Sequence, residues 1–327
     1  MTKRTLNLVV RSYDHLLPLA CGDIQPEGLD LNLDRRTDMR EFMTNPAFDA
    51  GEMSFSQYVI RTSQGERALV GLPIFVMRGF RHRCMFVRRD SELTTMQDLV
   101  GRRVGANAWP DSGSTWHRAA LREQGVSIDQ IDWWIGPADD PTYDSTGGRP
   151  SIALPPNVHT LPPGQTLQDQ VISGELDAMM CPWPPKRFAE RPSPLRRLLV
   201  HFRQEEQAYA RRVGFYPGYH ILALRHEVFE GEPWIARSLF HAFEQSRLMA
   251  EAQRRWLADA SPWLLADLEE IEDLLGPGWR AHGLEANRSM IQTFCDEELA
   301  QGLIARPIDP DALFAKAEQA IGGETHA

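Results

Sequence analysis

The stretch PIFVMRGFRHRCMFVRRD, from Pro73 to Asp90, decides the fold. Its two ends are apolar runs of the kind that form buried strands. Between them lies the polar segment Arg78-Gly79-Phe80-Arg81-His82. We interpret this segment as the place where the chain leaves one lobe, crosses a cleft and enters a second lobe, with anion-binding side chains on the crossing. The alternative is a hairpin with a basic, solvated tip.

Length, composition and charge favour two lobes and a small ligand. A chain of 327 residues exceeds the size at which single hydrophobic cores usually stop growing. Its 42% hydrophobic and 24% charged residues are typical of a globular protein. The formal charge of −10 argues against a nucleic acid or an anionic membrane surface as partner. Any anion site must therefore be built locally, against the overall field.

The cysteines and the N-terminus indicate a reducing compartment. The cysteines are far apart, without a CxxC pair or zinc spacing, and we expect free thiols: Cys21, Cys84, Cys181 and Cys295. The segment LPLACG (17–22) is similar to a lipoprotein cleavage site, but polar residues interrupt the apolar run that an export signal needs. No stretch approaches the roughly 18 to 20 apolar residues of a membrane span. We expect a cytoplasmic protein.

Alternating strands and helices predict an α/β first lobe with a mainly parallel sheet. Segments 5–10 and 48–53 are expected strands, and 26–33 is an expected turn that leads into a strand. Ser54 stands where it can cap the helix expected at 55–64. The second lobe continues the alternation, with strands expected at 103–106, 131–135, 158–161, 174–181 and 197–202. Seven prolines between 137 and 163 predict a long ordered loop there.

The second lobe also contains the helix start Ser112-Gly113-Ser114-Thr115. Free backbone N–H groups at such a start can seat a carboxylate, although every helix also needs an ordinary cap. Residues 214–225 predict a strand that returns to the first lobe. The segments after it are expected helices: 234–258, 263–274, 283–301 and 310–321.

The predicted domains follow from the two crossings. Residues 1–83 and 220–327 form the first lobe, residues 84–219 form the second, and the ligand cleft lies between them. The apolar residues of the C-terminal helices either cover the first lobe or form the surface of a homo-oligomer, and this choice stays open.

Two motifs resemble elements of type II periplasmic solute-binding proteins. DLVGRRVGAN (98–107) is similar to their DLxGKxVG element, and GELDAMM (174–180) is similar to their GexDA element. The resemblance implies two α/β lobes, joined by two crossing strands, that close on small anions by hinge motion.

Seven motifs along nearly the whole chain resemble the 4,5-dihydroxyphthalate decarboxylase family: PEGLDL, FDAGEMSFSQY, LPIFVMRGFRH, DLVGRRVG, STWHRAAL, GELDAMM and PGYHILAL. The resemblance implies a cytoplasmic enzyme on the solute-binding fold that decarboxylates a hydroxylated aromatic acid. The chain departs from the family pattern at ANAWPDSGS (106–114) and matches it only in part at Tyr13-Asp14-His15. These departures put the identity of the aromatic acid in doubt.

The chemistry of such a reaction sets which side chains are needed. Removal of CO2 from an aromatic ring requires a general acid that protonates the carboxylated carbon, a partner for the phenolic oxygen and a clamp for any remaining carboxylate. Histidine suits the acid because its pKa lies near neutrality. Arginine suits the clamp because its planar fork pairs with a carboxylate in a bidentate manner.

We predict His82 on the outgoing crossing and His220 on the returning one as the catalytic pair, facing each other, with Arg81 or Arg78 as the clamp. The alternatives are a solvated His82 in a basic turn and a satisfied core histidine at position 220. Glu52, at a strand end, either orients a histidine, accepts a phenolic proton or pairs with an arginine.

Further residues are candidates for substrate binding. Trp109 and Trp116 stack on an aromatic ring or simply pack in the core. The others stand at expected strand ends or at the helix start: Tyr13, His15, Ser54, Ser114 and Thr115.

We expect no cofactor, because no Gly-rich phosphate loop, no HxxxH or HxH pair and no nucleotide fingerprint occurs. A divalent metal bound by residues that converge only in the folded chain stays open. The partner is expected to be a small aromatic carboxylate. Two alternative functions remain: a non-catalytic solute-binding or sensor module, and a lyase of the same fold that eliminates water from a cyclic acid.

Overall fold

The computed structural model describes residues 3–37, 41–143 and 149–322, which divide into two compact units. Unit 1 holds the residues up to Arg78, Gly214–Asp296 and the residues from Ile304 onward. Unit 2 holds Gly79–Val213 and Glu297–Leu303. The chain changes units a few residues before the expected 83/84 and 219/220, so His82 belongs to unit 2. No sequence pattern signalled that 297–303 joins unit 2.

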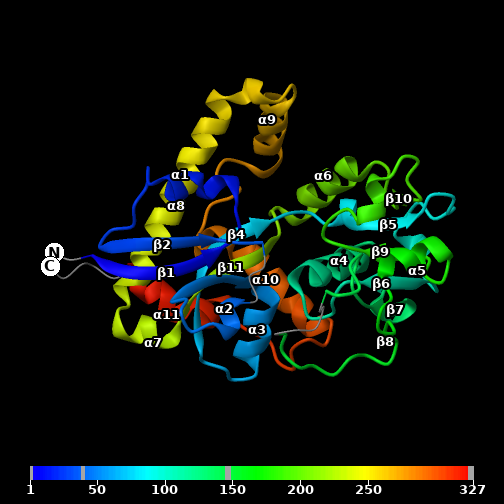
Figure 1. Cartoon of the computed structure of the whole chain (residues 1–327), viewed down its shortest axis with the longest axis horizontal. Helices are drawn as coiled ribbons and strands as arrows, with labels where there is room; N and C mark the ends of the chain where they lie inside the picture. Colours follow the sequence, from blue (N-terminus) through cyan, green and yellow to red (C-terminus); the bar gives the residue numbers. More distant parts are fainter. Residues whose placement is uncertain (1–2, 38–40, 144–148, 323–327) are drawn as a thin grey trace. The chain divides into compact units, whose positions relative to one another are not determined.

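Unit 1 contains a five-stranded sheet in the order β2-β1-β3-β11-β4 (Figure 1). Its strands are β1 (Arg4–Val10), β2 (Leu29–Arg35), β3 (Ala50–Ser54), β4 (Leu69–Arg78) and β11 (Gly218–Arg225). β1 pairs in parallel with β2 and β3, whereas β11 is antiparallel to both β3 and β4. β11 is antiparallel because the chain leaves unit 1 at the carboxyl end of β4 and re-enters it at the same end of the sheet. The sheet is therefore mixed.

The helices of unit 1 are short near the N-terminus and, apart from the six-residue α7, long after β11, where the sequence predicted them. They are α1 (Leu17–Cys21), α2 (Glu41–Thr44), α3 (Phe55–Ser63), α7 (His226–Gly231), α8 (Trp234–Trp256), α9 (Leu264–Leu275), α10 (Leu284–Ala300) and α11 (Pro310–Gly322), with α10 ending inside the 297–303 segment of unit 2. Short 3-10 turns lie at Asp14–Leu16 and Ala258–Ala260.

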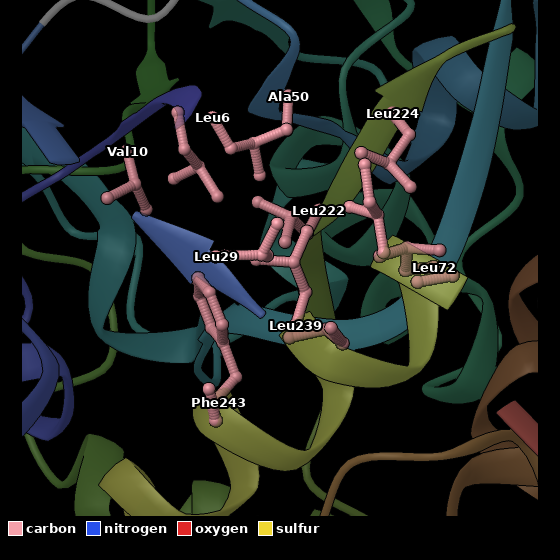
Figure 2. Close-up of a cluster of buried hydrophobic side chains, with 14 of the residues drawn as sticks. Leu6, Val10, Leu29, Ala50, Leu72, Leu222, Leu224, Leu239 and Phe243 are labelled. Atoms are coloured by element: carbon pink, nitrogen blue, oxygen red, sulfur yellow. The ribbon is translucent and has the colours of Figure 1, made fainter. Parts of the chain in front are cut away.

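One face of the unit 1 sheet packs against α8 (Figure 2). Alternate residues of β1, beginning with Leu6, point to this face because successive side chains of a strand alternate between faces. Leu239 and Phe243 of α8 meet them, and each is fully buried. On the opposite face, Phe55 of α3 stacks on Phe294 of α10 with ring centroids 4.7 Å apart. The sheet is thus buried on both faces, as its apolar strands require.

Unit 2 contains a six-stranded sheet in the order β10-β5-β9-β6-β7-β8. Its strands are β5 (Met85–Arg88), β6 (Arg103–Ala106), β7 (Asp132–Ile135), β8 (Val158–Thr160), β9 (Ala178–Met180) and β10 (Leu195–Arg197). Its helices are α4 (Ser112–Glu123), α5 (Leu167–Ser173) and α6 (Phe202–Val213), with 3-10 turns at His82–Cys84, Gln97–Leu99, Ile128–Gln130 and Lys186–Ala189. β6 to β9 are parallel, and β5 runs antiparallel to β9.

Two local predictions need correction. The strand predicted at 197–202 is wrong, because β10 ends at Arg197 and α6 begins at Phe202. Leu198 and Leu199 between them are buried, and the backbone N–H of Leu198 still donates to the carbonyl of Met85 in β5 at 2.9 Å. Helix α7 was not predicted, since its six residues are too short for a clear period.

Surface features bear on partners. Along the described ranges, no helix combines the length and the apolar character that a bilayer crossing needs. The four cysteines, all described, are free, and three of them are buried. Trp256 at the end of α8 is 88% exposed and Trp263 before α9 is 74% exposed. Whether a second copy of the chain covers them stays a prediction.

Gly71 in β4 provides a test of the unit 1 packing. A Cβ at this position would lie 2.6 Å from Cε1 of Tyr58, whose hydroxyl donates to the carbonyl of Leu313 at 3.1 Å. We expect Gly71→Ala to lower the free energy of unfolding by about 1–3 kcal/mol, because the buried ring must move. Gly231→Ala, with no atom near the added Cβ, should change it by less than about 0.5 kcal/mol. Equal effects in denaturant titrations would contradict this packing.

Candidate active site

The carboxyl edge of the unit 1 sheet gathers the polar residues that the sequence singled out. β1, β3 and β4 end there at Val10, Ser54 and Arg78, and the antiparallel β11 begins there at Gly218. Ligands of open α/β sheets bind outside this edge, because the loops that follow the strands are free to present side chains. The candidate site is therefore built from the ends of four strands.

Glu52 of β3 is the centre of this site. It is fully buried, and its carboxylate contacts four groups of unit 1. Oε1 lies 2.6 Å from the hydroxyl of Tyr13, 2.5 Å from Nδ1 of His220 and 3.4 Å from Nη1 of Arg11. Oε2 accepts the backbone N–H of Arg11 at 2.8 Å. A buried carboxylate is stable only with such a set of donors.

These contacts fix the protonation of the group. Burial raises the pKa of Glu52, but the hydrogen bond and charge of His220, the charge of Arg11 and the Tyr13 hydroxyl together lower it below its ordinary value. Glu52 is therefore ionised at neutral pH. Burial and the Glu52 charge raise the pKa of Tyr13, so its hydroxyl stays a donor.

The tautomer of His220 follows from the ionised Glu52. A carboxylate oxygen has no proton to give, so Nδ1 at 2.5 Å must carry one and donate it. Nη1 of Arg11, 3.2 Å from the same Nδ1, is then a close charged neighbour and not a donor to it. Nε2 is left as the nitrogen that can exchange a proton with a ligand. The side chain of His220 is 15% exposed, enough for a ligand to reach it.

His15 and Arg280 form a second pair in unit 1. His15 is buried, its ring stacks on that of Tyr13 with centroids 5.3 Å apart, and its Nδ1 lies 2.8 Å from Nη2 of Arg280. Burial and the charge of Arg280 lower the pKa of His15 to about 3. Arg280 was not predicted, because it lies in a loop without a recognisable motif.

Arg78, predicted as a clamp, is bound to neutral acceptors of the protein. It donates to the carbonyls of Tyr216 at 3.1 Å and Ala281 at 3.0 Å and to Oδ1 of Asn287 at 2.6 Å. These bonds tie the end of β4 to the loop before α10. Ser54 lies at the N-cap position of α3, as predicted, but its side chain makes no capping hydrogen bond.

Unit 2 has its own polar group at the start of α4. The side chain of Asp111 accepts the backbone N–H of Gly113 at 2.9 Å and of Ser114 at 3.4 Å, and it pairs with Arg149 at 3.1 Å. A protein carboxylate thus occupies the helix start that the sequence assigned to a substrate carboxylate. The residue that caps this helix was not recognised in the sequence.

Arg81 and His82 lie beside this helix start. A Cβ on Gly113 would lie 3.0 Å from Nη2 of Arg81, so the guanidinium lies close against the start of this helix. His82 is buried with its ring 5.1 Å from that of Tyr209, and burial lowers the pKa of His82 to about 4. His117 of α4 is also buried, and burial with the charge of Arg81 holds its pKa well below the ordinary value.

The other predicted residues in and before α4 contact the 297–303 segment or pack in unit 2. Thr115 donates to Glu298 at 2.9 Å. Trp109 is buried beneath the guanidinium of Arg118, whose Cζ lies 3.9 Å from the ring centroid. Trp116 is also buried. Thr115 and Arg118, which donates from Nε to Oε1 of Gln301 at 2.7 Å, hold the segment in unit 2.

Among the described residues, no group of three or more His, Cys, Asp or Glu side chains is placed to hold a metal ion. The sequence left a divalent metal open, and the described part of the chain offers no candidate set of ligands for one.

Comparison with solved structures defines the class of the fold. The periplasmic aliphatic sulphonate-binding protein SsuA from Escherichia coli aligns with 98% of this chain and 99% of its own, with a TM-score of 0.56 and 13% identity. The predicted solute-binding-protein-like α/β fold is confirmed. No family model matches the sequence.

Two relatives are named 4,5-dihydroxyphthalate decarboxylase. The relative from Comamonas testosteroni is 31% identical over 96% of this chain and 97% of its own length. The relative from Pseudomonas putida is 30% identical over 58% of this chain and 75% of its own. The chain belongs to the 4,5-dihydroxyphthalate decarboxylase family, as the seven motifs predicted, and is an enzyme of the carboxy-lyase class.

The buried neutral histidines predict how stability depends on pH. The unfolded state binds a proton at His15 near pH 6.5, whereas the folded state does so only near pH 3. The contribution of neutral His15 to the free energy of unfolding is therefore fully present above about pH 6.5. As the pH drops towards 3, the free energy of unfolding falls by up to about 1.4 kcal/mol per pH unit for each such group.

We expect His15→Asn, which keeps an acceptor for Arg280, to reduce this gradient between pH 6 and 4 by up to about 1.4 kcal/mol per pH unit. Denaturant titrations at several pH values measure it. His241→Asn, at an exposed position, controls for the loss of an imidazole. An unchanged gradient in His15→Asn would show that His15 is not held neutral.

Proposed function

We propose that this protein removes CO2 from a hydroxylated aromatic acid similar to 4,5-dihydroxyphthalate, with His220 as the general acid. The single observation that carries the proposal is the 2.5 Å contact between Nδ1 of His220 and the buried carboxylate of Glu52. This contact orients the imidazole and leaves Nε2 to act on the substrate. Membership of the decarboxylase family supports the reaction type.

The proposed reaction proceeds in two steps. Nε2 of protonated His220 gives its proton to the ring carbon that bears the carboxylate, while a para hydroxyl loses its proton to solvent water and becomes a keto group, and water returns that proton to the oxygen when the ring is restored. The bond between that carbon and the carboxylate then breaks, CO2 leaves, and the electron pair restores the aromatic ring. The Glu52 carboxylate stabilises the imidazolium form of His220 before the transfer and stays ionised throughout.

Arg11 and Tyr13 act through Glu52. Each donates a hydrogen bond to the carboxylate, so that Glu52 has one position and a low pKa. A protonated Glu52 would lose the acceptor that selects the Nδ1–H tautomer of His220. The two residues are therefore positioning residues.

His82 is less suited than His220 to deliver the proton. Its pKa of about 4 keeps it neutral at pH 7, so it can accept or share a hydrogen bond but holds no extra proton. We retain Arg81 as a proposed carboxylate clamp, because its guanidinium is buried beside the α4 start. The joint action of His82 and His220 on one substrate stays a prediction, as do the ligand cleft and the cytoplasmic location.

Replacement of the two central residues tests the proposal. We expect His220→Gln and Glu52→Gln each to lower kcat for 4,5-dihydroxyphthalate by at least ~100-fold, the usual scale of positioned proton transfer. The measurement is CO2 release with a panel of hydroxylated phthalates and benzoates. His159→Gln is a matched control, because His159 pairs with Asp132 at 2.8 Å on an exposed strand of unit 2.

The outcomes separate the functions. Full activity in His220→Gln would remove His220 from the acid role, and a ~100-fold loss in His82→Gln alone would transfer that role to His82. Thermal shifts with the same acids and no CO2 from any of them would favour the solute-binding module.

A further inference from the structure

Arg280 is a largely buried cation of unit 1 that donates a hydrogen bond to a neutral group. Its Nη2 donates to Nδ1 of His15 at 2.8 Å, and no carboxylate of the described ranges lies within ion-pair distance of it. The neighbouring Arg247 differs, because it pairs with Glu244 and with Glu251. The charge of Glu251 raises the pKa of Arg280, but the ion pairs of Glu244 and Glu251 are made with Arg247.

The missing counter-charge is unfavourable in the free protein. Burial lowers the pKa of Arg280, and burial with the charge of Arg280 lowers that of Arg78 to about 9. Two nearby guanidinium groups that are both poorly solvated repel each other and raise the free energy of the charged state. An anion bound beside Arg280 would relieve both effects.

His15 adds a donor at the same place. Arginine has only donors, so Nδ1 of His15 must accept and the proton of the neutral ring lies on Nε2. Nε2 is buried and has no hydrogen-bond partner within the described part of the chain. A buried N–H without an acceptor is costly unless a ligand supplies one.

Tyr13 links this pair to the proton-transfer site. Its ring stacks on His15 with centroids 5.3 Å apart, and its hydroxyl donates to Glu52 at 2.6 Å. The Arg280–His15 pair and the Glu52–His220 pair thus flank one side chain. A substrate of the size of one aromatic ring is suited to such neighbouring sites.

We propose that Arg280 and the Nε2–H of His15 bind the carboxylate that the substrate keeps, so that the enzyme selects aromatic dicarboxylates. The inference rests on the proposed function, in which the substrate loses its other carboxylate as CO2 at His220. The guanidinium of Arg280 has donors beyond the one used for His15, and these can pair with a carboxylate oxygen while His15 donates to the same group.

Arg280→Gln tests the inference. We expect its KM for 4,5-dihydroxyphthalate to rise at least ~10-fold, the scale of a charged hydrogen bond, with kcat within about threefold, because a retained carboxylate is bound equally before and during the reaction. Inhibition by catechol, which has no carboxylate, should stay within about threefold of its original strength. Arg255→Gln removes the same charge from an exposed pair with Glu272 and should change neither value.

Two outcomes overturn the inference. One is an unchanged KM, and the other is an equal loss of catechol inhibition. A further readout is unfolding without ligand: Arg280→Gln should unfold at the same temperature or higher, since it removes an uncompensated charge, and failure to fold would assign Arg280 a structural role instead. If the wild type releases no CO2 from any acid, the proposed function fails, and calorimetric binding of phthalate to both proteins still decides the subsite.

Discussion

A fully buried carboxylate must be surrounded by donors, and Glu52 sets this requirement for the catalytic edge of unit 1. The donors come from different parts of the chain: Arg11 and Tyr13 follow the first strand, and His220 begins the returning strand. The order β2-β1-β3-β11-β4 brings them together, because β11 lies beside β3. Satisfying one charge therefore fixes the tautomer of the histidine and the position of its exposed nitrogen.

The same edge also carries uncompensated positive charge, and the two features fit one type of ligand. The Glu52–His220 pair is suited to transfer a proton. Arg280 and His15 are suited to donate hydrogen bonds to a carboxylate, and neither accepts a proton from it. An acid that loses one carboxylate and keeps another requires both. The overall charge of −10 disfavours anion binding on the protein as a whole. The arginines near this edge therefore mark the place where an anion is favoured.

Fold and family could be predicted from the sequence because strand and helix periods, and seven motifs in order, extend over nearly the whole chain. His220 could be named because it lies on the returning crossing and within a family motif, whereas Glu52 and Tyr13 could be named because they lie near expected strand ends. Arg280 could not be predicted, since it lies in a loop and its importance appears only from its lack of a carboxylate. The helix start near Ser114 was interpreted as a ligand seat because the sequence does not reveal that Asp111 already fills it.

The central claim is that ionised Glu52 accepts a hydrogen bond from the Nδ1–H of His220 and leaves Nε2 for the substrate. Proton and nitrogen NMR of histidine-labelled protein measures this tautomer directly. The account predicts a proton on Nδ1 of neutral His220 in the wild type, hydrogen-bonded to a carboxylate, and the loss of that signal in Glu52→Gln. A neutral His220 that carries its proton on Nε2 and none on Nδ1, or a spectrum that Glu52→Gln leaves unchanged, would contradict it.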